Sequence, residues 1–68
     1  MALEFILQHE ADGGRLYEAR AADGAVIRLD VFSAYAQVQR GNGFVKRVVS
    51  EAEARAYAGS KWGGANTL

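Results

Sequence analysis

The sequence contains no cysteine and no proline. Without cysteine there is no disulfide framework, no thiolate zinc site and no cysteine nucleophile, so the usual stabilising devices of very small domains are absent. The chain has 68 residues, which suffices for one domain because a separate hydrophobic core needs on the order of 50 residues. We therefore expect one small domain that packing alone stabilises.

A net charge and a long apolar run are lacking as well. Eight Lys and Arg residues balance eight Asp and Glu residues, so no global field attracts the protein to nucleic acid or to an anionic membrane. No apolar run approaches the roughly 18 residues of a membrane span, and residues 1–7 lack a basic leader and a cleavage site. These absences predict a cytoplasmic protein that does not contact a membrane.

Alternating apolar and polar positions predict several short strands. Residues 2–9 alternate with period two, which is typical of a strand with one buried face. Turn signals that combine Asp with Gly, at residues 12–14 and 23–24, bracket a second strand over residues 15–21. The next strand is the clearest in the chain: one face carries Ala25, Ile27, Leu29 and Val31, and the other carries Val26, Arg28, Asp30 and Phe32.

Residues 33–40 fit two interpretations. Ser33 can cap a short helix, whereas the residues after it alternate as in a strand. We favour the strand because a glycine turn at residues 41–43 leads directly into residues 44–49, whose β-branched and aromatic side chains are typical of a strand. The two runs then form a second hairpin.

The period changes at Ser50. Ser50 and Glu53 form a capping box, an alanine-rich stretch with high helix propensity follows, and Gly59 is placed to end the helix. Residues 60–68 are rich in glycine and carry one bulky aromatic residue, Trp62. We expect residues 1–59 to form a single α+β domain and residues 60–68 to form a flexible or partly docked C-terminal tail.

These elements predict an α+β fold: a small antiparallel β-meander of four to five strands with one C-terminal α-helix. The alternative is a small five-stranded barrel closed by the same helix.

Residues that carry chemistry are sparse. His9, Glu10 and Asp12 are the one cluster of metal-capable side chains, but adjacent strand residues point to opposite faces, so we expect no metal site there. The chain has no G-x-S-x-G elbow, P-loop or G-x-G-x-x-G, and nothing links its single His to a serine and an acid. We expect a protein that is not an enzyme and that needs no cofactor.

Basic and aromatic residues gather around the last predicted hairpin. Stacking aromatics beside cations hold single-stranded nucleic acid on a sheet surface, and the residues for this alternative are Tyr35, Phe44, Lys46 and Arg47. Lys46 and Arg47 are strand neighbours and point to opposite faces, and two glutamates follow. Nucleic acid is therefore the second hypothesis rather than the first.

Three features favour contact with another protein. The clearest strand has apolar residues on both faces, of which one helix covers one. A meander has edge strands, and without proline these edges lack a common guard against further strand pairing. Trp62 is either intramolecular core filler or an exposed anchor, and Trp is favoured at interfaces. Dimerisation or strand addition by another chain follows as a hypothesis.

The leading interpretation is a non-enzymatic protein-binding module, an adaptor or inhibitor that occludes or bridges a larger protein. Its size suits phage-type inhibitors of host or defence machinery, and its excess of Arg over Lys suits a bacterial or phage coding sequence. Acidic residues weight the first half of the chain and basic residues the second, which also allows copies to pair as a homo-oligomer. The proposed binding residues are Arg28, Tyr35, Arg40, Lys46, Arg47 and Trp62.

Overall fold

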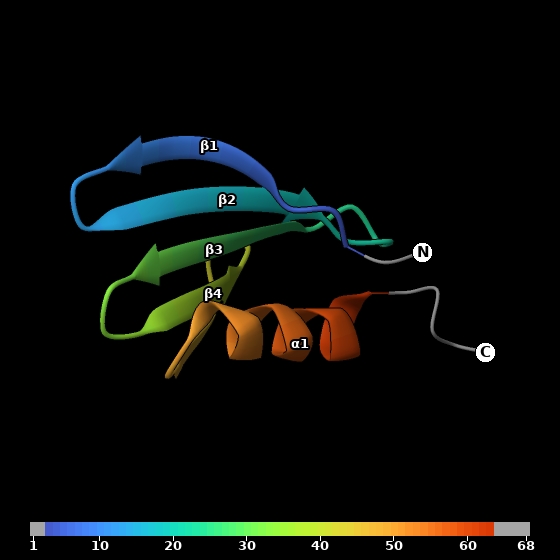
Figure 1. The fold of residues 1–68 in the computed structure, drawn as a ribbon. Coiled ribbons are helices and arrows are strands. Elements are labelled where there is room, and N and C mark those ends of the chain that lie inside the picture. Colours follow the sequence, from blue (N-terminus) through green and yellow to red (C-terminus); the bar gives the residue numbers. More distant parts are fainter. Residues whose placement is uncertain (1–2, 64–68) are drawn as a thin grey trace.

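The computed structural model describes residues 3–63. Five antiparallel strands lie in one sheet in chain order, and a single helix follows them (Figure 1). The elements are β1 (Ile6–Ala11), β2 (Gly14–Arg20), β3 (Val26–Phe32), β4 (Ala36–Arg40), β5 (Phe44–Val48) and α1 (Glu51–Trp62). The predicted meander with a C-terminal helix is therefore confirmed.

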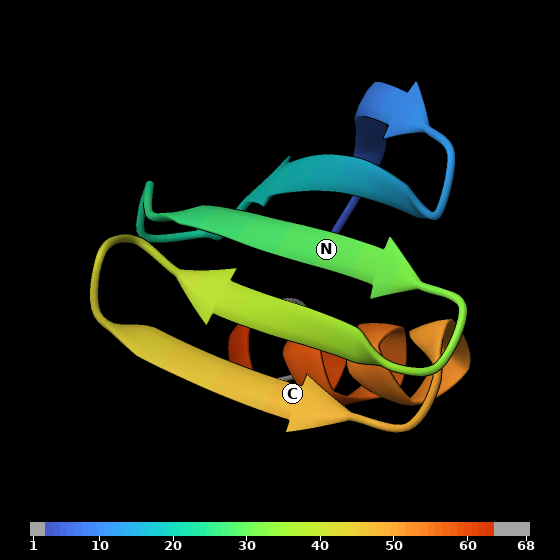
Figure 2. The same cartoon turned by 90° about the vertical axis from the view of Figure 1, so that its left-hand side faces the viewer.

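The sheet is open, so the alternative of a closed barrel is wrong. Within residues 3–63 neither β1 nor β5 pairs along its outer edge. Helix α1 packs on β3, β4 and β5, and Figure 2 shows it behind these strands while β1 and β2 curl away. We call the covered side of the sheet the helix face and the other side the open face.

Tight turns join the strands where the sequence predicts them. Gly13 and Gly24 adopt φ angles of +88° and +92°, a region that residues with a Cβ atom enter at a cost. After β3, the N–H of Phe32 donates to the carbonyl oxygen of Tyr35 at 2.8 Å. This turn sets β4 beside β3, so the strand interpretation is confirmed for Ala36–Arg40, residues 33–35 form the turn, and the helix interpretation is wrong.

Strand β1 differs from the prediction, which placed a strand over residues 2–9. It spans Ile6–Ala11, and its register shifts between Leu7, which pairs with Tyr17, and His9, which pairs with Leu16. Gln8 is the extra residue of this β-bulge. The bulge breaks the period-two pattern on which the predicted bounds rested.

The core lies between the helix face and α1. Ile27, Leu29 and Val38 are fully buried, and Ala54 and Ala58 of the helix are buried against them. Small alanine side chains let the helix backbone approach the sheet closely. Complete burial of each large apolar side chain stabilises the fold by about 1.5–3 kcal/mol.

The sequence predicts the start of α1 correctly but not its end. The Ser50 side chain accepts a hydrogen bond from the Glu53 N–H at 3.3 Å, as the capping box predicts. The helix does not end at Gly59, because it continues to Trp62 and the Gly63 N–H donates to the Gly59 carbonyl oxygen at 2.9 Å. Residues 60–62, expected in the tail, are thus helical. The tail residues 64–68 lie outside the described residues.

The helix has 12 residues. Within residues 3–63 no helix is long and apolar enough to cross a membrane.

Candidate functional site

The sequence-predicted site residues lie on both faces of the sheet. Arg40 pairs with Phe44, and buried Val38 pairs with Lys46, which places Phe44 and Lys46 on the helix face. Gln37 pairs with Arg47, which places Arg47 on the open face. The structure therefore brings together neither the six proposed protein-binding residues nor the four nucleic-acid residues as one surface.

Strand β5 forms an exposed edge of the sheet, at the bottom of the view in Figure 2. Every residue from Phe44 to Arg47 is exposed, and Val48 alone in this strand is buried. The pairing with β4 runs from Phe44 to Val48 without a register shift. An edge of this kind presents a straight row of backbone hydrogen-bonding groups to solvent.

The backbone groups that face outward can be identified from the hydrogen bonds of β4. The Gly41 N–H donates to the Val26 carbonyl oxygen at 2.9 Å, so the backbone of the preceding residue, Arg40, faces β5. In an antiparallel pair the groups of successive residues alternate in direction. Phe44, Lys46 and Val48, which pair with Arg40, Val38 and Ala36, thus bond to β4. The N–H and C=O groups of Val45 and Arg47 point outward.

On the helix face an aromatic cluster lies beside β5. We use this name for Phe44, Tyr57 and Trp62, whose ring centroids lie 5.7–6.1 Å apart. The Lys46 Nζ lies 5.5 Å from the centroid of the Tyr57 ring. Trp62 is half-buried and packs against the core, so it supports β5 on the helix face.

On the open face a second ring supports the other cation. The Arg47 Cζ lies 4.4 Å from the centroid of the Tyr35 ring, and that ring lies 4.9 Å from the ring of Phe32. Cation–π contacts at exposed sites contribute about 0.5–1 kcal/mol. Each of the two neighbouring cations of β5 thus rests on a tyrosine, one on each side of the sheet.

Three other arginines are held by carboxylates. Glu51 pairs with Arg15 at 2.9 Å and with Arg55 at 2.8 Å, which ties α1 to β2. Arg40 pairs with Asp23. Within residues 3–63 no ion pair engages Lys46 or Arg47.

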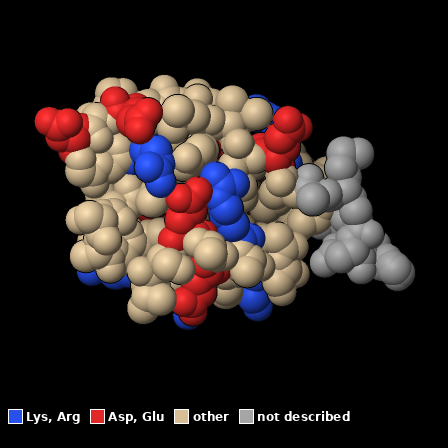
Figure 3. All heavy atoms as spheres, in the orientation of Figure 1, with Lys and Arg blue, Asp and Glu red and all other residues tan. Residues whose placement is uncertain are grey.

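The pKa values of these acids reflect the pairing. The hydrogen bond from Arg55 lowers the pKa of Glu51, and burial opposes this effect. The hydrogen bond from Arg40, together with one from the Ala25 N–H, lowers the pKa of Asp23. On the face drawn in Figure 3 acidic and basic side chains are interleaved, in keeping with local compensation of charge.

Arg28 lies away from the β5 edge. It stands on the open face of β3, directly opposite Glu18 of β2, and its other neighbour is Gln39 of β4. Asp30, two residues further along β3, is partly buried, which raises its pKa, while the charge of Arg28 acts in the opposite direction. Arg28 therefore has an acidic residue opposite it in the neighbouring strand, although within residues 3–63 no ion pair engages it.

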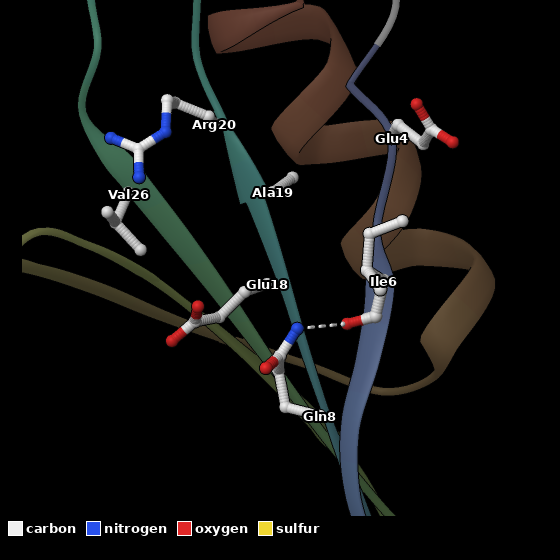
Figure 4. A pocket seen from close by; sticks show the side chains of 7 residues that line it. All are labelled: Glu4, Ile6, Gln8, Glu18, Ala19, Arg20 and Val26. Carbon is white, nitrogen blue, oxygen red and sulfur yellow. Dashed lines mark hydrogen bonds between the residues drawn. The ribbon is translucent and has the colours of Figure 1, made fainter.

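The opposite edge of the sheet is less suited to pairing. The bulge at Gln8 interrupts β1, and the Gln8 side-chain amide donates to the Ile6 carbonyl oxygen at 3.3 Å (Figure 4). A bulge breaks the regular spacing of outward backbone groups. An open hollow of about 370 Å³ lies beside this strand, lined by Glu4, Ile6, Gln8, Glu18, Ala19, Arg20 and Val26.

The metal-capable residues near the first turn do not converge. His9 pairs with Leu16 and Glu10 with Arg15, so the two side chains lie on opposite faces of β1. In the part of the chain that the structure describes, no three His, Cys, Asp or Glu side chains gather as metal ligands.

The β5 edge is the feature with a geometry that suits binding, since it combines outward backbone groups with two supported cations. No protein family, curated protein or solved structure matches this chain.

Sequence reasoning did not select Tyr57 as a site residue. It placed residues 60–68, which include Lys61 and Trp62, in a tail. In the structure all three are helical, and the Lys61 Nζ lies 5.8 Å from the Tyr57 ring centroid. The i,i+4 spacing of Tyr57 and Lys61 is the sequence signal for this contact.

Proposed function

We propose that this chain is a non-enzymatic protein-binding module that takes a strand of a larger protein onto the β5 edge. The observation that carries the proposal is the outer edge of β5, which within residues 3–63 is unpaired, exposed from Phe44 to Arg47 and free of bulges. An extended segment that adds to such an edge gains main-chain hydrogen bonds, and the flanking side chains give specificity.

The arrangement of the rest of the molecule supports this role. Helix α1 and the aromatic cluster pack behind β5, so the edge is held on a rigid element. Strand addition would fix the captured segment in an extended form. The module would thereby occlude that segment, as an inhibitor does, or bridge it to another component, as an adaptor does.

A role without catalysis is supported by the positions of the catalysis-capable side chains. His9 lies on the open face of β1, at the opposite edge of the sheet from β5. The Ser50 hydroxyl is engaged at the start of α1. A serine nucleophile needs a base within about 2.6–3.2 Å, and within residues 3–63 no hydrogen bond joins His9 to a serine.

The experiment uses random extended peptides displayed on beads, selected against the purified protein. Bound peptides are mapped by the hydrogen exchange of individual backbone amides. We expect protection of the Val45 and Arg47 amides. The Val45→Pro variant, which removes one outward N–H and leaves the bonds to β4 intact, should lose binding. Val45→Thr keeps the N–H and serves as the matched control.

Two results would contradict the proposal. One is a set of peptides that bind without protecting the Val45 and Arg47 amides. The other is equal binding by Val45→Pro and Val45→Thr.

A further inference from the structure

We infer that the strand received by β5 is acidic, with two neighbouring carboxylate side chains that meet Lys46 on the helix face and Arg47 on the open face. This inference rests on the proposed function and adds the chemistry of the partner to it. Lys46 and Arg47 are adjacent in sequence and lie on opposite faces of the sheet at its edge strand.

A strand is the ligand shape that can reach both cations. Successive side chains of a β-strand point to opposite faces of the sheet, so neighbouring carboxylates of an added strand separate to the two faces as Lys46 and Arg47 do. Side chains directly opposite each other on antiparallel strands have Cβ atoms about 4.5–5.5 Å apart. Both ion pairs are within reach without any movement of β5.

Each of the two cations is supported by a ring, and within residues 3–63 neither forms an ion pair with a carboxylate. Tyr57 lies beneath Lys46 at 5.5 Å and Tyr35 lies beneath Arg47 at 4.4 Å. Each ring limits the rotamers of a long side chain whose free rotation carries about 2 kcal/mol of entropy. The ion pairs described in residues 3–63 engage Arg15, Arg40 and Arg55. The charges on β5 are therefore oriented and available to a partner.

The other exposed residues of β5 predict the partner's side chains next to the two carboxylates. Phe44 is 43% exposed and Val45 is 49% exposed, so apolar partner side chains would bury them. We read an antiparallel partner strand from its N-terminus to its C-terminus. Its side chains opposite Arg47 and Lys46 are then acidic, and those opposite Val45 and Phe44 are apolar. The inferred recognition segment is thus Glu-Glu-Val-Val or a sequence of the same character.

A second copy of this chain fits the edge less well. When two β5 strands pair antiparallel, side chains on the same face lie opposite each other. If the two-fold axis passes through Lys46 or Arg47, that residue lies opposite its own copy, and the two like charges repel. A pair centred on Val45 avoids this contact but gives neither cation a carboxylate. Strand β1 of a second copy carries a bulge, and its acid Glu10 is two residues from Asp12, which lies in the turn after the strand.

Nucleic acid also fits less well. A single strand bound on a sheet surface lies on one face, with its phosphates along a basic groove and its bases on aromatic rings. Lys46 lies on the helix face and Arg47 on the open face. A phosphate backbone on either face would meet one of the two cations.

The experiment compares three soluble peptides with identical flanks and the cores Glu-Glu-Val-Val, Gln-Gln-Val-Val and Lys-Lys-Val-Val, each also made in reverse order for parallel addition. Fluorescence anisotropy gives Kd, and amide exchange of Val45 and Arg47 reports strand addition. The acidic peptide should bind roughly tenfold more tightly than the Gln peptide, since two exposed ion pairs are added. The basic peptide should not bind, and high salt should shrink the preference.

Matched variants assign the preference to the two cations. Lys46→Gln and Arg47→Gln should each remove about half of the preference on a logarithmic scale. Arg20→Gln, which removes an exposed cation from β2, should leave the preference unchanged. Equal losses in all three variants would overturn the inference, because net charge rather than the β5 pair would then govern binding.

The outcomes separate the inference from the proposed function. Equal Kd values for the acidic and Gln peptides, with protected Val45 and Arg47 amides, would overturn the acidic partner and retain strand addition. No protection by any peptide would overturn both. A random single-stranded oligonucleotide that binds more tightly than the acidic peptide would overturn the inference in favour of nucleic acid. So would a dimer of the free chain whose Val45 and Arg47 amides are already protected.

Discussion

Lys46 and Arg47 are neighbours in β5, yet their charged groups rest on different tyrosines at opposite faces of the sheet. The Lys46 Nζ lies 5.5 Å from the Tyr57 ring centroid, and the Arg47 Cζ lies 4.4 Å from that of Tyr35. Such an edge offers charge on both faces and hydrogen bonds between them. This combination suits an extended acidic peptide and underlies the proposed function.

The aromatic cluster should be the main support of β5. Replacing Tyr57 with Ala removes the ring that contacts Phe44, Trp62 and Lys46, so we expect a loss of about 1–3 kcal/mol in the free energy of unfolding. Tyr57→Phe keeps the ring and should lose less than about 0.5 kcal/mol. Urea unfolding followed by Trp62 fluorescence measures both. Equal losses in the two variants would show that the ring contacts do not stabilise the fold.

Glu51 should make stability depend on pH in the acidic range. Its pKa is lowered in the folded state by Arg55, so its contribution is complete above the ordinary carboxyl pKa and is lost as the pH falls through the folded value. Glu51→Gln should lower the free energy of unfolding at pH 7 by roughly 0.3–1 kcal/mol, a modest loss because water screens these part-exposed ion pairs. Near pH 2 wild type and variant should converge; a constant difference would exclude this linkage.

Asp30 should change the free energy of unfolding with pH in the direction opposite to Glu51. Burial raises its pKa, so the ionised form is disfavoured in the folded state and its cost appears as the pH rises through the ordinary carboxyl range. Asp30→Asn should raise the free energy of unfolding at pH 7 by a few tenths of a kcal/mol, a small gain since Asp30 is only partly buried and the charge of Arg28 opposes the effect. The gain should vanish on acidification. Destabilisation at pH 7 would show that Asp30 has a stabilising partner.

The stability of the first turn should depend on the backbone conformation of Gly13. Its φ angle is +88°, and a Cβ atom at this position would meet nothing within 4 Å, so any loss in Gly13→Ala comes from the backbone alone. We expect about 1 kcal/mol. Gly43→Ala is the matched control, because Gly43 also has open space and lacks a positive φ angle. Equal thermal stability of the two variants would contradict this explanation.

Much of the fold could be predicted because local signals agree with one another. The turn at Gly24 and the alternation along β3 predicted the central hairpin, and Ser50 with Glu53 predicted the start of the helix. Where signals conflict, packing decides. Gly59 favours the end of a helix, but the contacts of Trp62 with Phe44 and Tyr57 keep the chain helical past it.

The candidate site was harder to predict than the fold. Sequence order places Lys46 and Arg47 on opposite faces, but it does not show that Arg40 is held by Asp23 or that Arg28 faces Glu18. These pairings join residues distant in the chain, and the ion pair with Asp23 shows that Arg40 is already engaged. The bulge at Gln8, which distinguishes the two sheet edges, has no clear sequence signal either.

Hydrogen exchange of the β5 amides, with and without the Glu-Glu-Val-Val peptide, tests strand addition most directly. The amides of Phe44 and Lys46 bond to β4 in the free protein, whereas those of Val45 and Arg47 face solvent. Addition of the peptide should slow exchange at Val45 and Arg47 and leave Phe44 and Lys46 nearly unchanged. Uniform slowing along β5, or none at Val45 and Arg47, would contradict strand addition at this edge.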